Sequence, residues 1–297
     1  MNVLVSESLW QKIMSIEKNK VRRKIEELKN LPTLPGVIQK ISLMVESQNT
    51  SAEEVGKIIS KDQILSANVL RLINSAFYGF PGRISSITHG LVLLGFNVVK
   101  GLVLSTSIFD IMISKGMADL WKHSVGCATV AGIIARKLNQ PEPEEVSTAA
   151  LLHDFGKVVL KLEFPEKAGN AEKMVQERNI SIYEAENNVF EFTHATVGNW
   201  LCEKWNLPKN LSDPITYHHQ PSLARFAPRQ TAMVHLADIL IKANGFGFGG
   251  DILVSQIDKT AWESLKITPQ ILEEIITDMD GGIEDIDESM FSAGSEQ

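Results

Sequence analysis

The feature that most constrains this chain is a histidine and an aspartate placed side by side at the end of an apolar run. The run is Ala149-Ala150-Leu151-Leu152-His153-Asp154-Phe155-Gly156-Lys157. Alanine and leucine favour a helix, and their apolar character indicates that this helix lies inside the protein. An ionised carboxylate at a buried position must be paired or must coordinate a metal ion. The run therefore predicts a buried helix that carries a binding site.

Helical periodicity dominates the rest of the chain, which shows no strand alternation and no internal repeat. In the first half we expect helices at residues 10–29, 37–46, 52–60, 63–75, 86–94 and 97–112. In the second half we expect them at residues 118–139, 145–162, 168–179, 182–204, 209–218, 229–244 and 268–278. Ser51 and Glu54 form a capping-box pattern before the third helix, and Leu94-Gly95 is a tight turn. The sequence thus predicts an all-α fold.

Prolines and charge divide the chain into four predicted parts. Residues 1–30 contain an amphipathic helix, for which internal packing and a short coiled coil with a partner both stay open. Two prolines in Leu31-Pro32-Thr33-Leu34-Pro35 end it. Residues 31–116 form an N-terminal helical subdomain, and residues 117–280 form a second one. Residues 281–297 read as an acidic flexible tail, because nine Asp or Glu and no Lys or Arg follow Lys266.

Composition excludes several classes of protein. The net charge of -7 comes from the acidic end, since the rest carries 29 basic and 27 acidic side chains, and we expect no specific nucleic-acid binding. Cys127 and Cys202 lie far apart without a CxxC pattern, which indicates a reducing cytosol. The start does not resemble a signal peptide. The apolar residues 91–113 are interrupted by polar ones and favour two buried helices over a membrane span. We expect a cytoplasmic protein without a membrane partner.

Further imidazoles and carboxylates occupy positions from which they can join His153 and Asp154. They are His123, His194, His218, His219 and Asp238. A single buried histidine is more often hydrogen-bonded to the backbone than bound to a metal, but this explanation weakens when several are placed alike. Neutral imidazole suits iron, zinc, manganese or nickel, and a bridging carboxylate suits a pair of such ions. Two ions about 3.5–4 Å apart polarise a phosphoryl group and supply hydroxide near neutral pH.

The order of these residues resembles a known superfamily. His123, His153-Asp154 and Asp238 resemble the H…HD…D signature of HD-domain metal-dependent phosphohydrolases, and the other histidines resemble the HD-GYP branch. The span from about Leu31 to Ala243 is similar to an HDOD domain, the HD-related output domain of bacterial signalling proteins. The motifs of that similarity are Leu31-Pro-Thr-Leu-Pro35, Ile58-Ile-Ser-Lys-Asp62, Leu70-Arg-Leu-Ile-Asn-Ser-Ala76, Leu94-Gly95 and Leu151-Leu-His-Asp-Phe-Gly-Lys157. The resemblance implies a multi-helical HD-domain-like bundle, with the metal site in residues 117–280.

The resemblance also implies a role for each matching residue. The first metal ion would be held by His123, His153, Asp154 and Asp238. Asp154 would bridge to a second ion, completed by His194, His218 and His219. Asp154 and Lys157 would be the catalytic residues, with Lys157 meeting a substrate phosphate; a plain solvated lysine is the equal alternative.

Two neighbouring residues have open roles. Asp119 lies one turn before His123, where it is either an extra ligand or a surface residue that suits a helix start. His235 lies one turn before Asp238, where it either orients that carboxylate or is a satisfied core residue. The sequence does not decide the role of either residue.

The resemblance leaves two functions open. Where HD-GYP proteins have a Gly-Tyr-Pro motif, this chain has Gln220-Pro-Ser-Leu-Ala224, which counts against cyclic-di-GMP hydrolysis. We expect a signalling output domain with an intact site for one or two divalent ions (Fe, Mn, Ni or Zn). It is either a metal-dependent phosphohydrolase for a nucleotide or another phosphoester, or a non-catalytic module in which a structural metal supports binding of a signalling protein.

Overall fold

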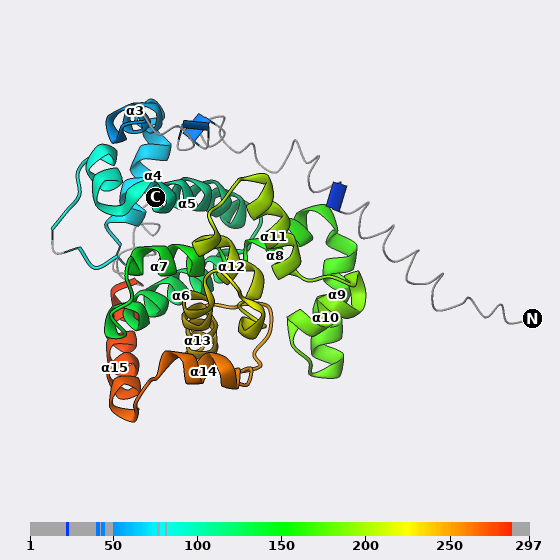
Figure 1. Ribbon diagram of the computed structural model, residues 1–297. Coiled ribbons are helices and arrows are strands. Elements are labelled where there is room, and N and C mark those ends of the chain that lie inside the picture. The colour runs from blue at the N-terminus through cyan, green and yellow to red at the C-terminus, as the bar shows by residue number, and fades with distance from the viewer. Residues whose placement is uncertain are drawn as a thin grey trace, which may run out of the picture.

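The computed structural model describes residues 22–23, 40–41, 43–44, 50–75, 78–80 and 82–286, and every regular element in these ranges is helical (Figure 1). The predicted all-α fold is confirmed for this part of the chain. Most of the helices expected at residues 10–29 and 37–46 lies outside the described residues. The same holds for residues 287–297 of the expected tail.

The N-terminal part consists of α3 (Ala52–Ile59), α4 (Gln63–Ile73) and α5 (Ile87–Ser114). The capping box is present: Ser51 Oγ accepts from the Glu54 N–H, and the Glu54 carboxylate accepts from the Ser51 N–H. Gly95 has φ 76° and ψ 168°, a conformation that glycine adopts readily, and it divides α5 where the Leu94-Gly95 turn predicts. By length and composition α5 could span a membrane, but most of its apolar window is buried inside the protein.

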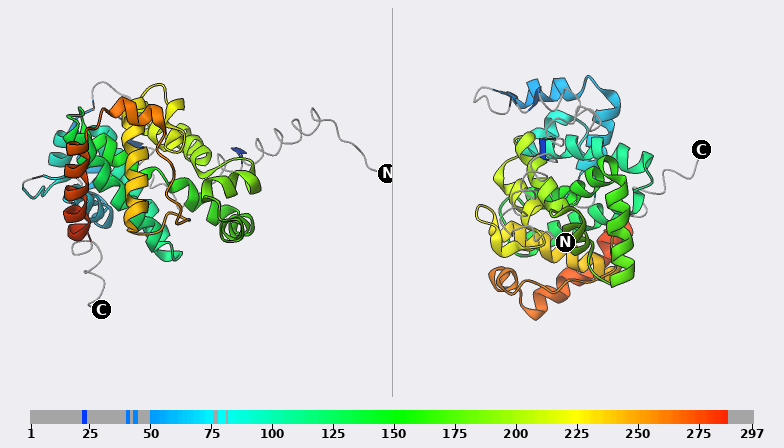
Figure 2. Two further views of the ribbon diagram at one scale, coloured as in Figure 1. Left: turned by 90° about the horizontal axis from the view of Figure 1, so that it is seen from below. Right: turned by 90° about the vertical axis from the view of Figure 1, so that its right-hand side faces the viewer.

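The second part supplies the remaining helices. They are α6 (Ala118–Lys137), α7 (Pro143–Leu152), α8 (Phe155–Glu163), α9 (Pro165–Arg178), α10 (Ile182–Phe190), α11 (His194–Lys204), α12 (Lys209–Tyr217), a 3-10 turn (Pro221–Leu223), α13 (Pro228–Asn244), α14 (Lys259–Leu265) and α15 (Pro269–Ile286). Helix α6 is almost wholly buried, because α7, α13 and α15 all pack against it. Helices α3 and α4 lie at one end of the molecule and the α9–α10 pair at the other (Figures 1 and 2).

Several predicted helix boundaries were wrong. The helix expected at 145–162 is broken at His153-Asp154, and the one expected at 182–204 is broken at Glu191, whose φ is 66°. Helix α14 was not predicted. Helix α15 continues past the predicted end at residue 278 to Ile286, so residues 281–286 of the expected flexible tail are helical. A Cβ on Gly282 would meet the Thr129 side chain at 3.0 Å, so this glycine lets α15 approach α6 closely instead of ending the helix.

Candidate metal centre

Helix ends bring most of the predicted ligands together. His153 and Asp154 occupy the junction between α7 and α8, His194 is the first residue of α11, and His218 caps α12. Two further predicted ligands, His123 and Asp238, project from α6 and α13, which pack against each other. The junction is tight, because α8 passes directly over the start of α11: a Cβ on Gly156 would collide with the His194 carbonyl oxygen. The break at His153-Asp154 is therefore accompanied by close packing between α8 and α11, which are separated in the sequence.

One group of side chains surrounds Asp154 Oδ2. His123 Nε2 lies 3.5 Å and His153 Nε2 lies 3.3 Å from this oxygen. Asp238 Oδ1 lies 3.1 Å from His123 Nε2 and 3.9 Å from His153 Nε2. All four residues are buried. Ligand atoms of His123, His153 and Asp238, with that of Cys127, lie within 4.8 Å of one another, which is close enough to share one metal ion, and Asp154 lies equally close to His153 and His218.

A second group surrounds the other oxygen of the same carboxylate. His194 Nε2 lies 3.3 Å and His218 Nε2 lies 3.8 Å from Asp154 Oδ1. His194 Nε2 is also 3.3 Å from His218 Nε2 and 3.0 Å from His219 Nε2. Because each oxygen of Asp154 faces one group, this carboxylate is placed to bridge two ions. The structure thus brings all seven predicted ligands together.

The ring nitrogens that face away from the centre reveal where the lone pairs lie. Nδ1 of His153 is 2.6 Å from the Ala150 carbonyl oxygen, and Nδ1 of His218 is 3.0 Å from that of Ile215. A carbonyl oxygen only accepts, so each Nδ1 donates, and each ring in its neutral form turns a lone pair on Nε2 toward the centre. His153 Nε2, Asp154 Oδ1 and Asp238 Oδ1 are buried without a hydrogen-bond partner. Lone pairs and carboxylate oxygens that face one another need a cation between them, so this donor set fits a metal ion.

Burial and the local charges set the protonation states. Burial lowers the pKa of His123, His218 and His219, which favours neutral rings. Burial also acts to lower the pKa of His153, but the adjacent Asp154 carboxylate outweighs it and raises that pKa. Burial by itself raises the pKa of the Asp154 carboxyl, but His153 and Lys157 outweigh it and hold that pKa well below its usual range. Lys242 and His123 have the same effect on the pKa of Asp238. Neutral imidazoles with ionised carboxylates are the ligands of iron, zinc, manganese and nickel.

Three residues of the site were missed by the sequence analysis. The buried Glu186 carboxylate accepts from the His194 backbone N–H at 2.8 Å and from His194 Nδ1–H at 2.6 Å. Lys242 Nζ lies 3.3 Å from Asp238 Oδ2. Cys127 Sγ lies 3.6 Å from His123 Nε2, and burial raises the pKa of this thiol well above its usual value. Only Lys242 and Cys127 had a sequence signal, since each lies one turn beyond a ligand.

The two undecided residues lie outside the ligand groups. Asp119 is exposed, and its main-chain carbonyl oxygen accepts from the Phe248 N–H. Of the two roles left open for His235, the hydrogen bonds support the satisfied core residue. His235 Nε2 accepts from the Asp258 N–H, and Nδ1 donates to the His218 carbonyl oxygen at 2.6 Å. His235 therefore fixes the backbone at His218, because its two nitrogens are occupied there.

Comparison with known proteins identifies a domain family. The family model of the HDOD domain matches residues 31–221. An uncharacterised protein of Treponema pallidum (strain Nichols) is 25% identical over 197 residues, which cover 65% of this chain and 38% of that protein. The YuxH protein of Bacillus subtilis (strain 168) is 26% identical over 138 residues, covering 43% of this chain and 34% of YuxH. The matched segments span about a third of these relatives' length.

Solved structures share the fold. An HDOD domain protein of unknown function from Geobacter sulfurreducens superposes with a TM-score of 0.71 at 24% identity, over 95% of this chain and 99% of the other. A proposed phosphohydrolase from Shewanella amazonensis SB2B gives 0.64 at 22% identity, over 90% and 97%. A proposed signal transduction protein from Marinobacter aquaeolei VT8 gives 0.68 at 21% identity, over 95% and 66%. At these identities the likeness establishes the arrangement of helices.

Proposed function

The chain belongs to the HDOD domain family, and on that premise we propose that it is a bacterial signalling output domain that binds two divalent transition-metal ions and hydrolyses a phosphoester. The observation that carries the proposal is the position of Asp154 between two groups of histidines. A single buried carboxylate with imidazole nitrogens near both of its oxygens is an arrangement that suits a pair of ions.

Each side chain has a role in this proposal. His123, His153, Asp154 and Asp238 would hold one ion, and Asp154, His194, His218 and His219 would hold the other. When bound, such ions supply Lewis acidity toward a phosphoryl group and activate water near neutral pH.

Lys157 is suited to meet the substrate phosphate. Its Nζ donates to Asp154 Oδ2 at 2.6 Å and to the Gly249 carbonyl oxygen at 2.7 Å. An ammonium group has three donors, so the third remains to bind a phosphate oxygen. The charge that develops on a transferred phosphoryl group is stabilised by such a fixed donor.

A second function is favoured by the depth of the centre. His153, His194 and His218 are fully buried, and Asp154 is nearly so. An ion enclosed in this way also serves as a structural cross-link. The alternative proposal is therefore a non-catalytic regulatory module, in which the metal holds the helices together and a signalling protein binds another surface.

Metal content and turnover distinguish the two functions. The protein is reconstituted with iron, manganese, nickel or zinc and analysed for bound metal. Each form is then assayed against a cyclic dinucleotide, a nucleotide and a generic phosphomonoester. His153→Ala removes a ligand, and His89→Ala is the matched control because His89 is exposed on α5.

The enzyme proposal expects turnover that His153→Ala abolishes and His89→Ala leaves unchanged. Tight metal binding without turnover of any substrate supports the regulatory module. Protein that binds none of the four metals contradicts both proposals.

A further inference from the structure

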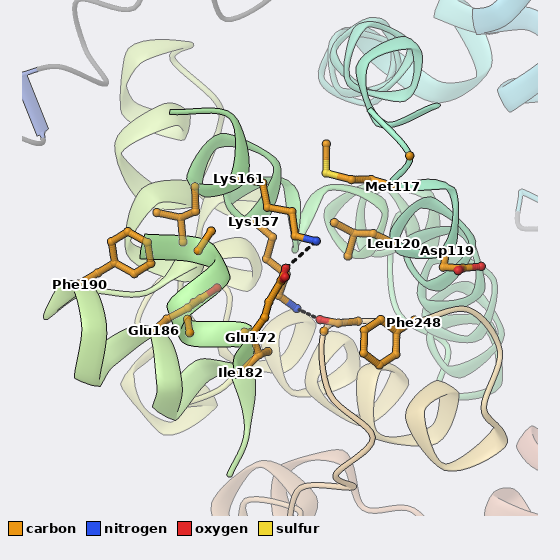
Figure 3. Close-up of a pocket in the computed structure, with 16 residues that line it drawn as sticks. Met117, Asp119, Leu120, Lys157, Lys161, Glu172, Ile182, Glu186, Phe190 and Phe248 are labelled. Carbon is orange, nitrogen blue, oxygen red and sulfur yellow. Dashed lines mark hydrogen bonds and ion pairs between the residues drawn. The ribbon is translucent and has the colours of Figure 1, made fainter. Parts of the chain in front are cut away.

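A cavity of about 130 Å³ lies directly beside the metal centre. It is enclosed by α8, α9, α10, the start of α6 and the loop that follows α13 (Figure 3). Its mouth carries Lys161 and Glu172, which form an ion pair at 2.7 Å and are both partly exposed. The cavity therefore connects solvent with the inner wall of the site.

That inner wall is made of the groups that contact the ligands. Lys157, 5% exposed, lines the cavity, and its ammonium group binds the Gly249 carbonyl oxygen (Figure 3). The same ammonium group also binds Asp154. Glu186, 3% exposed, lines the cavity while its Oε2 binds His194. A molecule in the cavity would thus touch two charged groups that each hold a predicted metal ligand.

The side walls between mouth and inner wall are apolar. They include Met117, Leu120, Ile182, Phe190 and Phe248. Phe248 is 48% exposed and belongs to the loop that follows α13. This loop lies against α6, because Gly247 and Gly249 leave no side chain between the loop and His123. Two aromatic rings and aliphatic side chains favour an uncharged, apolar group in the middle of the cavity.

Size and charge limit the ligand further. One water molecule needs about 10–15 Å³ of such space, so the cavity has room for a ligand of about ten non-hydrogen atoms. The lining carries the acidic Asp119, Glu172 and Glu186 against the basic Lys157 and Lys161. This balance disfavours a ligand with several negative charges. Cyclic dinucleotides and nucleoside triphosphates are too large to lie wholly within this cavity, and the triphosphates also carry several negative charges.

We propose that this cavity selects a compact phosphomonoester, whose apolar alcohol portion lies between Phe190 and Phe248 and whose phosphate faces Lys157. The inference rests on the proposed function and specifies its substrate class. Hydrolysis breaks the P–O bond to the alcohol and forms a P–O bond to the oxygen of water. One proton of that water passes to the alcohol, so that inorganic phosphate and free alcohol are released.

Calorimetric binding to the metal-loaded protein tests this independently of turnover. The probes are phenyl phosphate, inorganic phosphate, cyclic di-GMP and ATP. Phenyl phosphate should bind more tightly than the two nucleotides. Phe248→Ala removes one aromatic wall and should weaken phenyl phosphate binding about threefold to tenfold, while inorganic phosphate binding is unchanged. Phe226→Ala is the matched control, because Phe226 is 68% exposed and does not line the cavity.

A second variant fills the cavity. Ala168→Leu adds volume from α9 at the lining, and it should weaken phenyl phosphate binding by a similar factor without changing the metal content. Both variants are checked for bound metal before titration. Phe248 is exposed, so Phe248→Ala tests the inference even where Ala168→Leu disturbs folding.

The results separate this inference from the proposed function. If phenyl phosphate binding depends on Phe248 but no substrate is hydrolysed, the cavity is confirmed as the binding site and the proposed enzyme activity is wrong. If nucleotides are hydrolysed and phenyl phosphate is not preferred, the proposed enzyme activity stands, but the cavity does not select the substrate. The inference is also overturned when phenyl phosphate does not bind, or when Phe248→Ala and Phe226→Ala behave alike.

Discussion

Among single residues, Glu186 is notable because one of its carboxylate oxygens accepts two hydrogen bonds from the same predicted ligand, His194. Its Oε2 accepts both the backbone N–H and the ring Nδ1–H of His194, at 2.8 and 2.6 Å. The ring is thereby held with its Nε2 lone pair toward Asp154 and His218. A carboxylate behind a metal-binding histidine fixes the tautomer and raises the basicity of the ligand. In the proposed two-ion centre, Glu186 would be a positioning residue for the second ion.

Replacement of this carboxylate should weaken the metal site. Glu186→Ala should lower metal affinity about 10–100-fold. Glu186→Gln should lower it less, because the amide oxygen still accepts from Nδ1–H. Affinity is measured by competition with a chelator of known strength. Glu184→Gln, two residues earlier and exposed on the same helix, should bind metal as the wild type does. Equal affinities for the Glu186 and Glu184 variants would contradict the role.

The metal-ligand candidates were predictable because each is a histidine or aspartate at a position where apolar residues are expected. Their separation into two groups around Asp154 came only from the family resemblance. Glu186 was not predictable in this way. It lies eight residues before His194, and the left-handed turn at Glu191 separates the two helices. No helical spacing relates Glu186 to its partner, since the contact arises from the angle between α10 and α11.

At the level of elements, the junction between α7 and α8 is where local sequence and tertiary structure disagree. The alanines and leucines before His153 favour an unbroken helix, and the sequence therefore predicted residues 145–162 as one element. The chain instead turns at His153-Asp154, which directs both side chains toward the centre. Helix α8 then packs on the start of α11 through Gly156, where no side chain fits. This contact was not predictable from helix propensity.

Two glycine substitutions test the importance of this contact. Gly169 is exposed inside α9 with no atom within 4 Å of an added Cβ, so Gly169→Ala should stabilise the protein by about 0.5–1 kcal/mol. Gly156→Ala makes the same change against the His194 backbone. It should destabilise the protein by about 1–3 kcal/mol through overpacking and also weaken metal binding. Urea unfolding measures both free energies, and equal effects of the two substitutions would contradict the packing argument.

For the whole molecule, the centre connects segments that are far apart in the sequence. Its predicted ligands come from α6, the α7–α8 junction, α11, the end of α12 and α13. Helix periodicity predicted most of these helices, but it does not specify which of them pack together. The resemblance to HDOD domains supplied that information for the ligands. It did not indicate the cavity, which depends on α9, α10 and the loop after α13.

Because one centre joins five segments, metal removal should lower the stability of the whole described bundle. A ligand that binds only the folded state stabilises it by about 2.7 kcal/mol at a concentration 100 times its dissociation constant. In a protein of this size each kcal/mol shifts the melting temperature by about 2–4 °C, so a chelator should lower it by about 5–10 °C. His153→Ala should melt at the same temperature with and without chelator, whereas His89→Ala should keep the wild-type difference. If wild-type protein shown to contain metal melts unchanged after chelation, the ions do not hold these helices together and the structural role is wrong.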